Sequence, residues 1–461
     1  MSTITEQIAE YAANLKYEDL TEDAIARAKV RLLDSLGVIC AGQNGPGNDA
    51  YLDIARHNGG AQDASVFVYG DKLPMESAAV MNALMMRSYD FEAIEAEGLD
   101  LKSFAAHISG TTVPTALAVA EATHATGKEM LTALILGDDV AARLGANSGF
   151  DVYAGWDNTG TQNCLAATLI AGKMMGLDKE QFINALGIAE NMLGSVVDNI
   201  NDHTLAFKLP IALSCRNAIL AAQLASKGFT AMRDAIGGNH GFFNRYGSDA
   251  KNEEGVVKDL GKRFFADVVI KPYAACRATH PSITACEEIR KMEGFDVDKI
   301  AHVKVRVTPR TLKGFVGQPF ELGEGPIPQA SGAFSIIFTA ADMLYRGQVR
   351  PEDYSREKMT EPGLTRIIDA IELAPELDPN EYQTSEVIVT LDDGKEFFYR
   401  TEVPKGDIFK NPCTDEEILD KYYKNMEFSG HVTRETADAA RAQVEKFEEI
   451  DDVARLVSLF V

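Results

Sequence analysis

Cysteine and histidine are scarce in this chain of 461 residues, and neither is grouped as in a metal site. The six cysteines form no CxxC pair and the eight histidines form no HExxH motif, whereas zinc sites commonly use such short spacings. Isolated cysteines are typical of reduced, mostly buried thiols. We therefore expect neither a metal site nor disulfide bonds.

Positively charged residues are also few compared with negatively charged ones. The chain has 45 lysines and arginines against 69 aspartates and glutamates, a formal net charge of −24. Such a charge repels nucleic acid and anionic membranes. We expect no apolar run long enough to span a bilayer, and the first 15 residues (MSTITEQIAEYAANL) lack the basic and apolar regions of a signal peptide. The sequence predicts a cytoplasmic protein that binds neither nucleic acid nor membrane.

Three common catalytic motifs are missing as well. No GxGxxG follows a predicted strand, no P-loop lysine is present, and no GxSxG elbow occurs. These absences argue against nucleotide-binding enzymes and serine hydrolases. The composition, with 46% hydrophobic and 25% charged residues, is that of a globular protein, and the length predicts two domains.

The first 250 residues are predicted to be almost entirely helical. Thr21 is expected to cap a helix that ends at Gly42, with Ile25 and Leu32 at helical spacing. Segments rich in alanine and leucine follow the same pattern at residues 78–93, 113–127, 128–146, 161–176 and 214–228. Because these segments are apolar on more than one face, we expect buried helices of a large bundle.

From about residue 264 the pattern changes to strands mixed with helices. Strands are predicted at 264–270 and 302–309 and as a hairpin at 385–403, with helices at 282–293 and 331–347. Thr414 and Glu417 form a capping box where helix resumes. We predict a mainly helical α+β protein with an all-helical domain (1–263 and 405–461) and an inserted α/β domain (264–404) that closes the active-site cleft.

Residues 264–285 (FFADVVIKPYAACRATHPSITA) give the strongest indication of a site. Lys271 follows the predicted strand, which ends at a proline that lacks a backbone donor. Arg277 and His280 precede a helix expected to begin with Ser282 as its N-cap. Cationic side chains beside a helix N-terminus suit an anion, and a compact group suits a small carboxylate. A solvated basic loop is the alternative.

Four other candidates lie in the helical part. Asp90 belongs to an acidic stretch at the end of an apolar helix, where a carboxylate either orients a catalytic cation or faces water. His107 lies just before Val113-Pro114, which is expected to open a helix, and suits proton transfer near neutral pH, although loop histidines are commonly structural. Asp157 lies in a polar loop, and Lys208 either serves the site or snorkels to solvent.

Taken in this order, the segments resemble the MmgE/PrpD family along nearly the whole chain. The resemblance is carried by LLDSLGVICAG, SAAVMNALMMRSYDFEA, HISGTTVPTALAVAE, GWDNTGT and IKPYAACRATHPSITA. It implies a large helical domain built from both termini, a smaller α/β domain and a homodimer. It also implies chemistry without a cofactor on di- or tricarboxylates, in a cleft between the domains.

The resemblance implies roles for individual residues. Asp90 matches the first aspartate of the family's acidic stretch, His107 its active-site histidine, and Lys208 and Lys271 its two cleft lysines. Three positions depart from the family pattern: Ile94 replaces a threonine, Asp157 a histidine, and Phe315 the tyrosine of decarboxylating members. We assign substrate binding to Arg277, His280, Asp157, Tyr273 and Phe315. Asp157 is either a base or, as we favour, a selectivity element that disfavours an extra substrate carboxylate.

These residues together predict a lyase that removes a proton α to a carboxylate of a small di- or tricarboxylate and expels water. His107 would carry the proton, with Asp90 orienting it or raising its pKa. Lys208, Lys271, Arg277 and His280 would stabilise the developing negative charge. Three alternatives stay open: an epimerase or isomerase at the same site, a decarboxylase, and a carboxylate-binding paralogue without activity.

Overall fold

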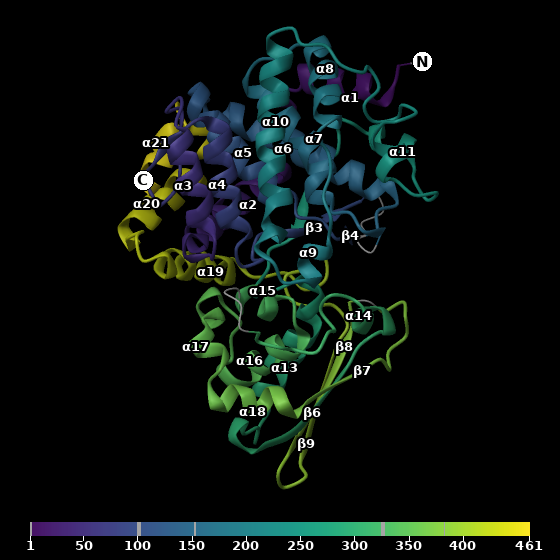
Figure 1. Ribbon diagram of the computed structural model, residues 1–461, viewed down its shortest axis with the longest axis vertical. Coiled ribbons are helices and arrows are strands. Elements are labelled where there is room, and N and C mark those ends of the chain that lie inside the picture. The colour runs from purple at the N-terminus through teal and green to yellow at the C-terminus, as the bar shows by residue number, and fades with distance from the viewer. Residues whose placement is uncertain (1, 99–102, 152–153, 324–327, 382) are drawn as a thin grey trace.

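The computed structural model describes residues 2–98, 103–151, 154–323, 328–381 and 383–461. Helices dominate it, and the strands form small sheets, so the predicted mainly helical α+β class is confirmed. Figure 1 shows two lobes: helices from both ends of the chain gather in one, and helices and strands from the green part of the chain form the other.

The first lobe is a bundle of helices. Its central helix α10 packs against α4, α5, α7 and α8, and α6 packs against α7. Many of these helices are rich in alanine, which lets their backbones approach closely. In chain order this lobe contains α1 (Ile4–Asn14), α2 (Glu22–Ala41), α3 (Asn48–Asn58), α4 (Met75–Arg87), α5 (Ile108–Thr123), α6 (Gly127–Ser148), α7 (Gln162–Met174), α8 (Lys179–Glu190), α9 (Asp198–Asn201), α10 (Leu209–Ser226), α11 (Phe242–Tyr246) and α12 (Glu253–Val257).

The C-terminal helices return to this first lobe (Figure 1). Both α19 (Asp415–Ser429) and α20 (Arg434–Glu445) pack against α2, and α21 (Ala454–Val457) packs against α5. The predicted capping box is confirmed, because the Glu417 amide donates to Thr414 Oγ1 while the Thr414 amide donates to the Glu417 carboxylate. Thr21 caps α2 as predicted, accepting from the Ala24 amide.

The second lobe is built around a four-stranded sheet of order β7-β6-β8-β9. Strands β6 (Ile300–Arg306) and β7 (Ile371–Ala374) are parallel, whereas β8 (Ser385–Leu391) pairs antiparallel with β6 and with β9 (Glu396–Thr401). Alternate residues of β8 are buried, because helix α13 (His280–Arg290) packs on the sheet. The remaining helices are α14 (Pro309–Lys313), α15 (Pro328–Ala333), α16 (Ile336–Arg346), α17 (Arg356–Met359) and α18 (Pro362–Ala370).

Among the described residues, two smaller sheets lie outside this four-stranded sheet. Strands β1 (Ala64–Ser65) and β2 (Lys72–Leu73) pair with each other, and the other sheet has the order β4-β3-β5, with β4 (Ser103–Phe104), β3 (Ile94–Glu97) and β5 (Asp267–Val269). Strand β5 is the centre of the predicted strand at 264–270. It pairs with β3, which precedes α5, and so ties the start of the second lobe to the acidic stretch after α4.

Helix boundaries near the candidate site differ from the sequence prediction. Helix α13 begins at His280 rather than at Ser282, with a proline in its first turn, where the missing N–H needs no partner in the helix. Helix α5 begins at Ile108, so Pro114 lies inside it. The predicted helix at 331–347 is divided between α15 and α16, because Ser335 caps α16 through the Phe338 amide.

One prediction about long apolar runs was wrong. The stretch Leu205–Ser226, which ends with α10, is long and apolar enough to cross a membrane by length and composition, and 61% of its most apolar window is buried within the fold. A core helix of a globular protein passes the same test.

Candidate active site

Five titratable side chains meet before the start of α5: Arg87, Asp90, Glu92, His107 and Lys271, here called the ion cluster. Arg87 Nη1 donates to Asp90 and, at 2.7 Å, to Glu92 Oε1. Lys271 Nζ donates to Asp90 Oδ2 at 2.9 Å. Nδ1 of His107 lies 2.8 Å from Glu92 Oε1 and 3.0 Å from Arg87 Nη1. The cluster is therefore a continuous network of charges and one imidazole.

A tight turn after α4 places the two carboxylates of the cluster. Asp90 has a positive φ of 50°, in the left-handed region that aspartate tolerates better than most residues. The turn directs Asp90 and Glu92 back to Arg87 at the end of the helix. Lys271 arrives from the end of β5, and β5 pairs with the strand that follows Glu92.

Burial and charge together determine the protonation of the cluster. Burial alone raises the pKa of Glu92, but the charges of Arg87, His107 and Lys271 outweigh it and lower that pKa below its usual range. Burial, followed by the charge of Arg87, lowers the pKa of His107, and Glu92 only partly opposes this. At neutral pH we therefore expect an ionised Glu92 beside a neutral imidazole that can accept a proton.

The carboxylate that contacts His107 is not the one the sequence predicted. Asp90 Oδ1 is 4.0 Å from His107 Nδ1, whereas Glu92 Oε1 is 2.8 Å away. Asp90 instead bridges Arg87 and Lys271. Arg87 and Glu92 were missed as site residues, although both belong to the segment around Asp90. Their closeness to Asp90 in the sequence was the available signal, but it does not show which carboxylate contacts the imidazole.

Lys208 lies in a short 3₁₀ turn, Leu205–Lys208, just before α10, and contacts Ser88, the residue after Arg87. Its Nζ donates to Pro46 O and Asn48 Oδ1, both at 2.8 Å, and to Ser88 Oγ at 3.2 Å. Among the described residues the structure shows no ion pair for this ammonium. Burial lowers the pKa of Lys208 to about 7, and its 2% exposure shows that it does not snorkel to solvent.

The loop that contains Asp157 supports the chain around His107. Asp157 Oδ1 accepts from the Thr159 amide at 2.9 Å. Burial alone lowers the pKa of Arg87, but the charges of Asp90, Glu92 and Asp157 outweigh it and raise that pKa. Two asparagines that were not predicted as site residues donate to backbone carbonyls at or near His107. Asn158 Nδ2 donates to Ala105 O at 2.7 Å, and Asn163 Nδ2 donates to His107 O at 2.8 Å.

Three predicted substrate-binding residues use their polar atoms on protein groups. Arg277 Nε lies 3.1 Å from Glu95 Oε1, and its Nη1 donates to Lys405 O at 2.7 Å. Nε2 of His280 is 3.1 Å from Ala275 O, and the Tyr273 hydroxyl donates to Glu287. The Tyr273 ring packs edge-on against His280 at 5.1 Å. Because Arg277 and His280 are buried, the alternative of a solvated basic loop is wrong. Their role toward a substrate stays a prediction.

Phe315 belongs to a row of aromatic side chains that reaches the cluster. Its ring centroid lies 6.1 Å from that of Phe334, which lies 5.7 Å from that of Phe207. The Arg87 guanidinium lies 5.6 Å from the centre of the Phe207 ring. Phe315, in the second lobe, is thus two rings away from Arg87.

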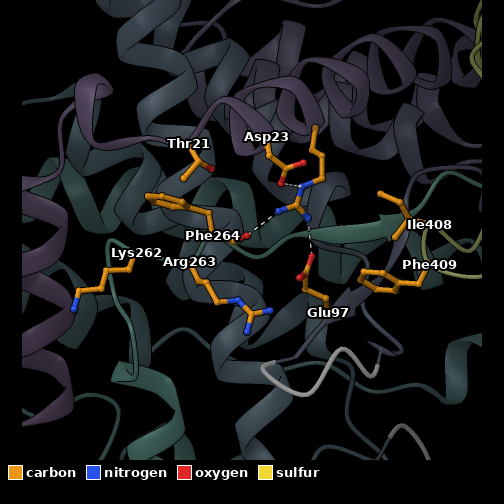
Figure 2. A pocket seen from close by; sticks show the side chains of 9 residues that line it. Thr21, Asp23, Glu97, Lys262, Arg263, Phe264, Ile408 and Phe409 are labelled. Atoms are coloured by element: carbon orange, nitrogen blue, oxygen red, sulfur yellow. Dashed lines mark hydrogen bonds and ion pairs between the residues drawn. The ribbon is translucent and has the colours of Figure 1, made fainter.

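Two cavities lie near β5. The first, of 420 Å³, is lined by residues outside the predicted site (Figure 2). Arg27 is one of its lining residues and donates to Glu97 Oε2 at 2.6 Å and to Phe264 O at 3.0 Å. The second, of 490 Å³, is lined by residues that include Lys271, Tyr273 and Lys421. Accessible space therefore reaches the segment that carries Lys271.

Asp90, Glu92 and His107 each offer a metal-ligand atom, and these atoms lie within 4.8 Å of one another. Nη1 of Arg87, however, is within hydrogen-bond distance of all three side chains. The guanidinium donates to carboxylate oxygens that a metal ion would need, and its positive charge repels a divalent cation. The donor set thus fits arginine better than a metal ion.

We expect activity to be unchanged after incubation with EDTA and dialysis, because Arg87 occupies the position that a cation would take. Turnover before and after chelation, with metal content measured in parallel, tests this. Loss of turnover that one divalent ion restores would contradict the prediction.

The fold and the site define a two-lobed, mainly helical protein with a buried acid–base cluster. The model of the MmgE/PrpD N-terminal domain matches residues 6–254, and that of the MmgE/PrpD C-terminal domain matches residues 273–449. The chain therefore belongs to the MmgE/PrpD family, and the resemblance seen in its motifs is confirmed.

Curated relatives match this chain over nearly its whole length. Cis-aconitate decarboxylase of Aspergillus terreus (strain NIH 2624 / FGSC A1156) is 24% identical over 469 residues, covering 94% of this chain and 91% of the relative. The cis-aconitate decarboxylases of Mus musculus and Homo sapiens are each 25% identical, with all of this chain covered and 93% and 95% of the relatives.

Proposed function

We propose that this protein is a lyase that acts, without a cofactor, on a small di- or tricarboxylate by removing a proton α to a carboxylate and expelling water. The observation that carries the proposal is the exposure of His107. Its side chain is 14% exposed, whereas the other four side chains of the ion cluster are at most 2% exposed. A substrate would therefore meet the cluster at an imidazole, the group suited to proton transfer.

The Glu92 carboxylate determines which imidazole nitrogen acts as the base. Because Glu92 Oε1 is an acceptor 2.8 Å from Nδ1, we place the proton on Nδ1 and the lone pair on Nε2. Nε2 then takes the α-proton, and Glu92 stabilises the imidazolium that forms. Transfer of this proton to the hydroxyl on the neighbouring carbon completes the reaction: the C–O bond breaks, water leaves and a C=C bond remains.

Lysines stabilise the negative charge that this step creates. Lys208 Nζ has three neutral oxygen partners, so a substrate carboxylate would supply the counter-charge that its surroundings lack. Lys271 neutralises Asp90, which reduces repulsion between that carboxylate and an anionic substrate. Among the described residues, Lys208 is thus an ammonium whose hydrogen-bond partners carry no charge.

Decarboxylation is the second candidate, because the relatives described above are named cis-aconitate decarboxylases. In that reaction the electron pair left by departing CO₂ would take a proton from the His107 imidazolium. We keep dehydration first because Phe315 and Asp157 depart from the family pattern. An epimerase would return the proton to the other face of the same carbon. The selectivity role of Asp157, the homodimer and the cytoplasmic location remain predictions.

Proton exchange in D₂O tests the proposal. The metal-free protein is incubated with a panel of hydroxy-, amino- and unsaturated di- and tricarboxylates, and ¹H NMR follows the α-protons. A new C=C signal identifies dehydration, loss of a carboxylate carbon identifies decarboxylation, and exchange with appearance of the opposite epimer identifies epimerisation. The His107→Asn protein is the control for contaminating enzymes. No exchange or turnover across the panel would contradict the proposal and favour the binding paralogue.

The two perturbed pKa values predict a bell-shaped pH profile of kcat/KM. His107 must be neutral to accept a proton, so kcat/KM falls as pH drops through its pKa, which lies below the ordinary 6.5. Lys208 must be charged to bind a carboxylate, so kcat/KM also falls as pH rises through about 7. Lys208→Arg, which stays charged, should remove the alkaline limb. A wild-type kcat/KM that still rises above about pH 8 would contradict this role for Lys208.

A further inference from the structure

We propose that Asp267 is a positioning residue for His107: from strand β5 it caps the N-terminus of α5 and so holds the imidazole in register with Lys271. The inference rests on the proposed function, because it assigns Asp267 a task in the same proton transfer.

The cap consists of two hydrogen bonds from the first turn of α5. Asp267 Oδ2 accepts from the Ser109 amide at 2.8 Å, and Oδ1 accepts from the Ile108 amide at 3.3 Å. The side chain of the residue that precedes a helix normally provides the cap, and for α5 that residue is His107. Within the described residues the His107 side chain makes no such bond. Because Asp267 supplies the cap, the imidazole remains available to Glu92 and to a substrate.

The strand that supplies the cap also leads to Lys271 of the ion cluster. Asp267 pairs with Ala96 and Val269 pairs with Ile94 in the antiparallel β3–β5 ladder. Lys271 lies just beyond this ladder on the β5 side, and Glu92 lies just before it on the β3 side. The ladder and the cap together therefore connect the segments that carry His107, Glu92 and Lys271. Without the cap, the start of α5 keeps the Asn163 bond to His107 O but loses both of its hydrogen bonds to β5.

The test compares Asp267→Asn with a matched change on the same helix. Glu121, near the opposite end of α5, is also a buried carboxylate that accepts a backbone amide, from Ser65 at 2.7 Å. Glu121→Gln therefore changes a similar backbone-amide acceptor on α5, far along the helix from His107. The probe is the Nδ1–H resonance of His107 in ¹H–¹⁵N NMR, assigned by its absence in His107→Asn. Turnover of a substrate found in the carboxylate panel is measured in parallel, per folded protein.

We expect Asp267→Asn to shift the His107 resonance and to lower kcat roughly 10- to 100-fold, with KM changed by less than about twofold, because small misplacements of a reacting group have effects of this size. Glu121→Gln should leave both readouts at wild-type values. An unchanged His107 resonance in Asp267→Asn, or an equal shift in both variants, would overturn the inference.

The NMR readout separates this inference from the proposed function. A resonance that shifts only in Asp267→Asn, with no turnover by any protein including the wild type, supports the positioning role and refutes the lyase. If Asp267→Asn does not fold, the test instead measures amide hydrogen exchange in the wild-type protein. The Ile108 and Ser109 amides should then be as protected as the interior of α5, and rapid exchange at both would overturn the cap.

Discussion

Replacing His107 by asparagine is expected to lower kcat by roughly 10²- to 10⁴-fold while leaving KM nearly unchanged. Asparagine retains a polar group near Glu92 but cannot accept and release a proton near neutral pH. Steady-state kinetics on the substrate identified in the panel measures the effect. A kcat within about threefold of the wild type would remove His107 from the proton transfer.

His124 offers a matched control for this change. It follows the last residue of the same helix, α5, and its Nδ1 lies 2.9 Å from a carboxylate oxygen of Asp452, an arrangement like that of His107 with Glu92. Its side chain is exposed and far along the helix from the cluster. We expect His124→Asn to leave kcat and KM unchanged.

Glu92 provides a second check on the same step. If Glu92 acts through His107, Glu92→Gln should lower kcat in the wild-type background but add little in the His107→Asn background, because residues that act as a unit are not additive. Equal effects in both backgrounds would show that Glu92 has a role separate from His107.

Replacing Lys271 by alanine is expected to lower kcat/KM by roughly 30- to 1,000-fold, the effect of losing about 2–4 kcal/mol of electrostatic stabilisation. From the sequence alone, Lys271 is expected at a strand end that faces a cleft, where its replacement would leave the fold intact. The structure changes that expectation, because Lys271 is fully buried and bound to Asp90. Removing one partner of a buried ion pair leaves an uncompensated charge, so we also expect the free energy of unfolding to fall by about 3–5 kcal/mol.

Two further variants, measured by urea unfolding and by activity, separate the effect of the lost charge on catalysis from its effect on stability. Asp90→Asn combined with Lys271→Ala should recover part of the lost stability, because no unpaired carboxylate remains, but it should not recover activity. Lys424→Ala is the control: Lys424 lines the same 490 Å³ cavity, but its ion pair with Asp420 is half-exposed and should contribute less than about 1 kcal/mol. A Lys271→Ala protein as stable and active as Lys424→Ala would contradict both roles.

Much of the fold was readable from local pattern alone. Helical periodicity, the Thr21 cap and the capping box at Thr414 placed helices correctly, and Gly394, with a φ of 83°, occupies the predicted hairpin turn. These signals act within a few residues, so the sequence contains them in full. The helix starts at His280 and Ile108 were misplaced. The cap of α5 comes from Asp267, 158 positions away from Ser109, and the residues around the start of α5 do not indicate it.

The sequence by itself determined the chemical types of three groups in the candidate site: an ammonium, an imidazole and a carboxylate. Lys271 at a strand end, His107 at a helix start and an acidic stretch after an apolar helix were all identified from their surroundings. Only the tertiary structure decided how they pair: Glu92 rather than Asp90 faces His107, and Arg87 contacts both carboxylates. Lys271 and Asp90 are 181 positions apart, and Arg87 and His107 are 20 apart. Contacts over such separations depend on how α4, α5 and β5 pack together. A choice between two carboxylates two residues apart rests on the backbone turn at Asp90, which only the folded chain reveals.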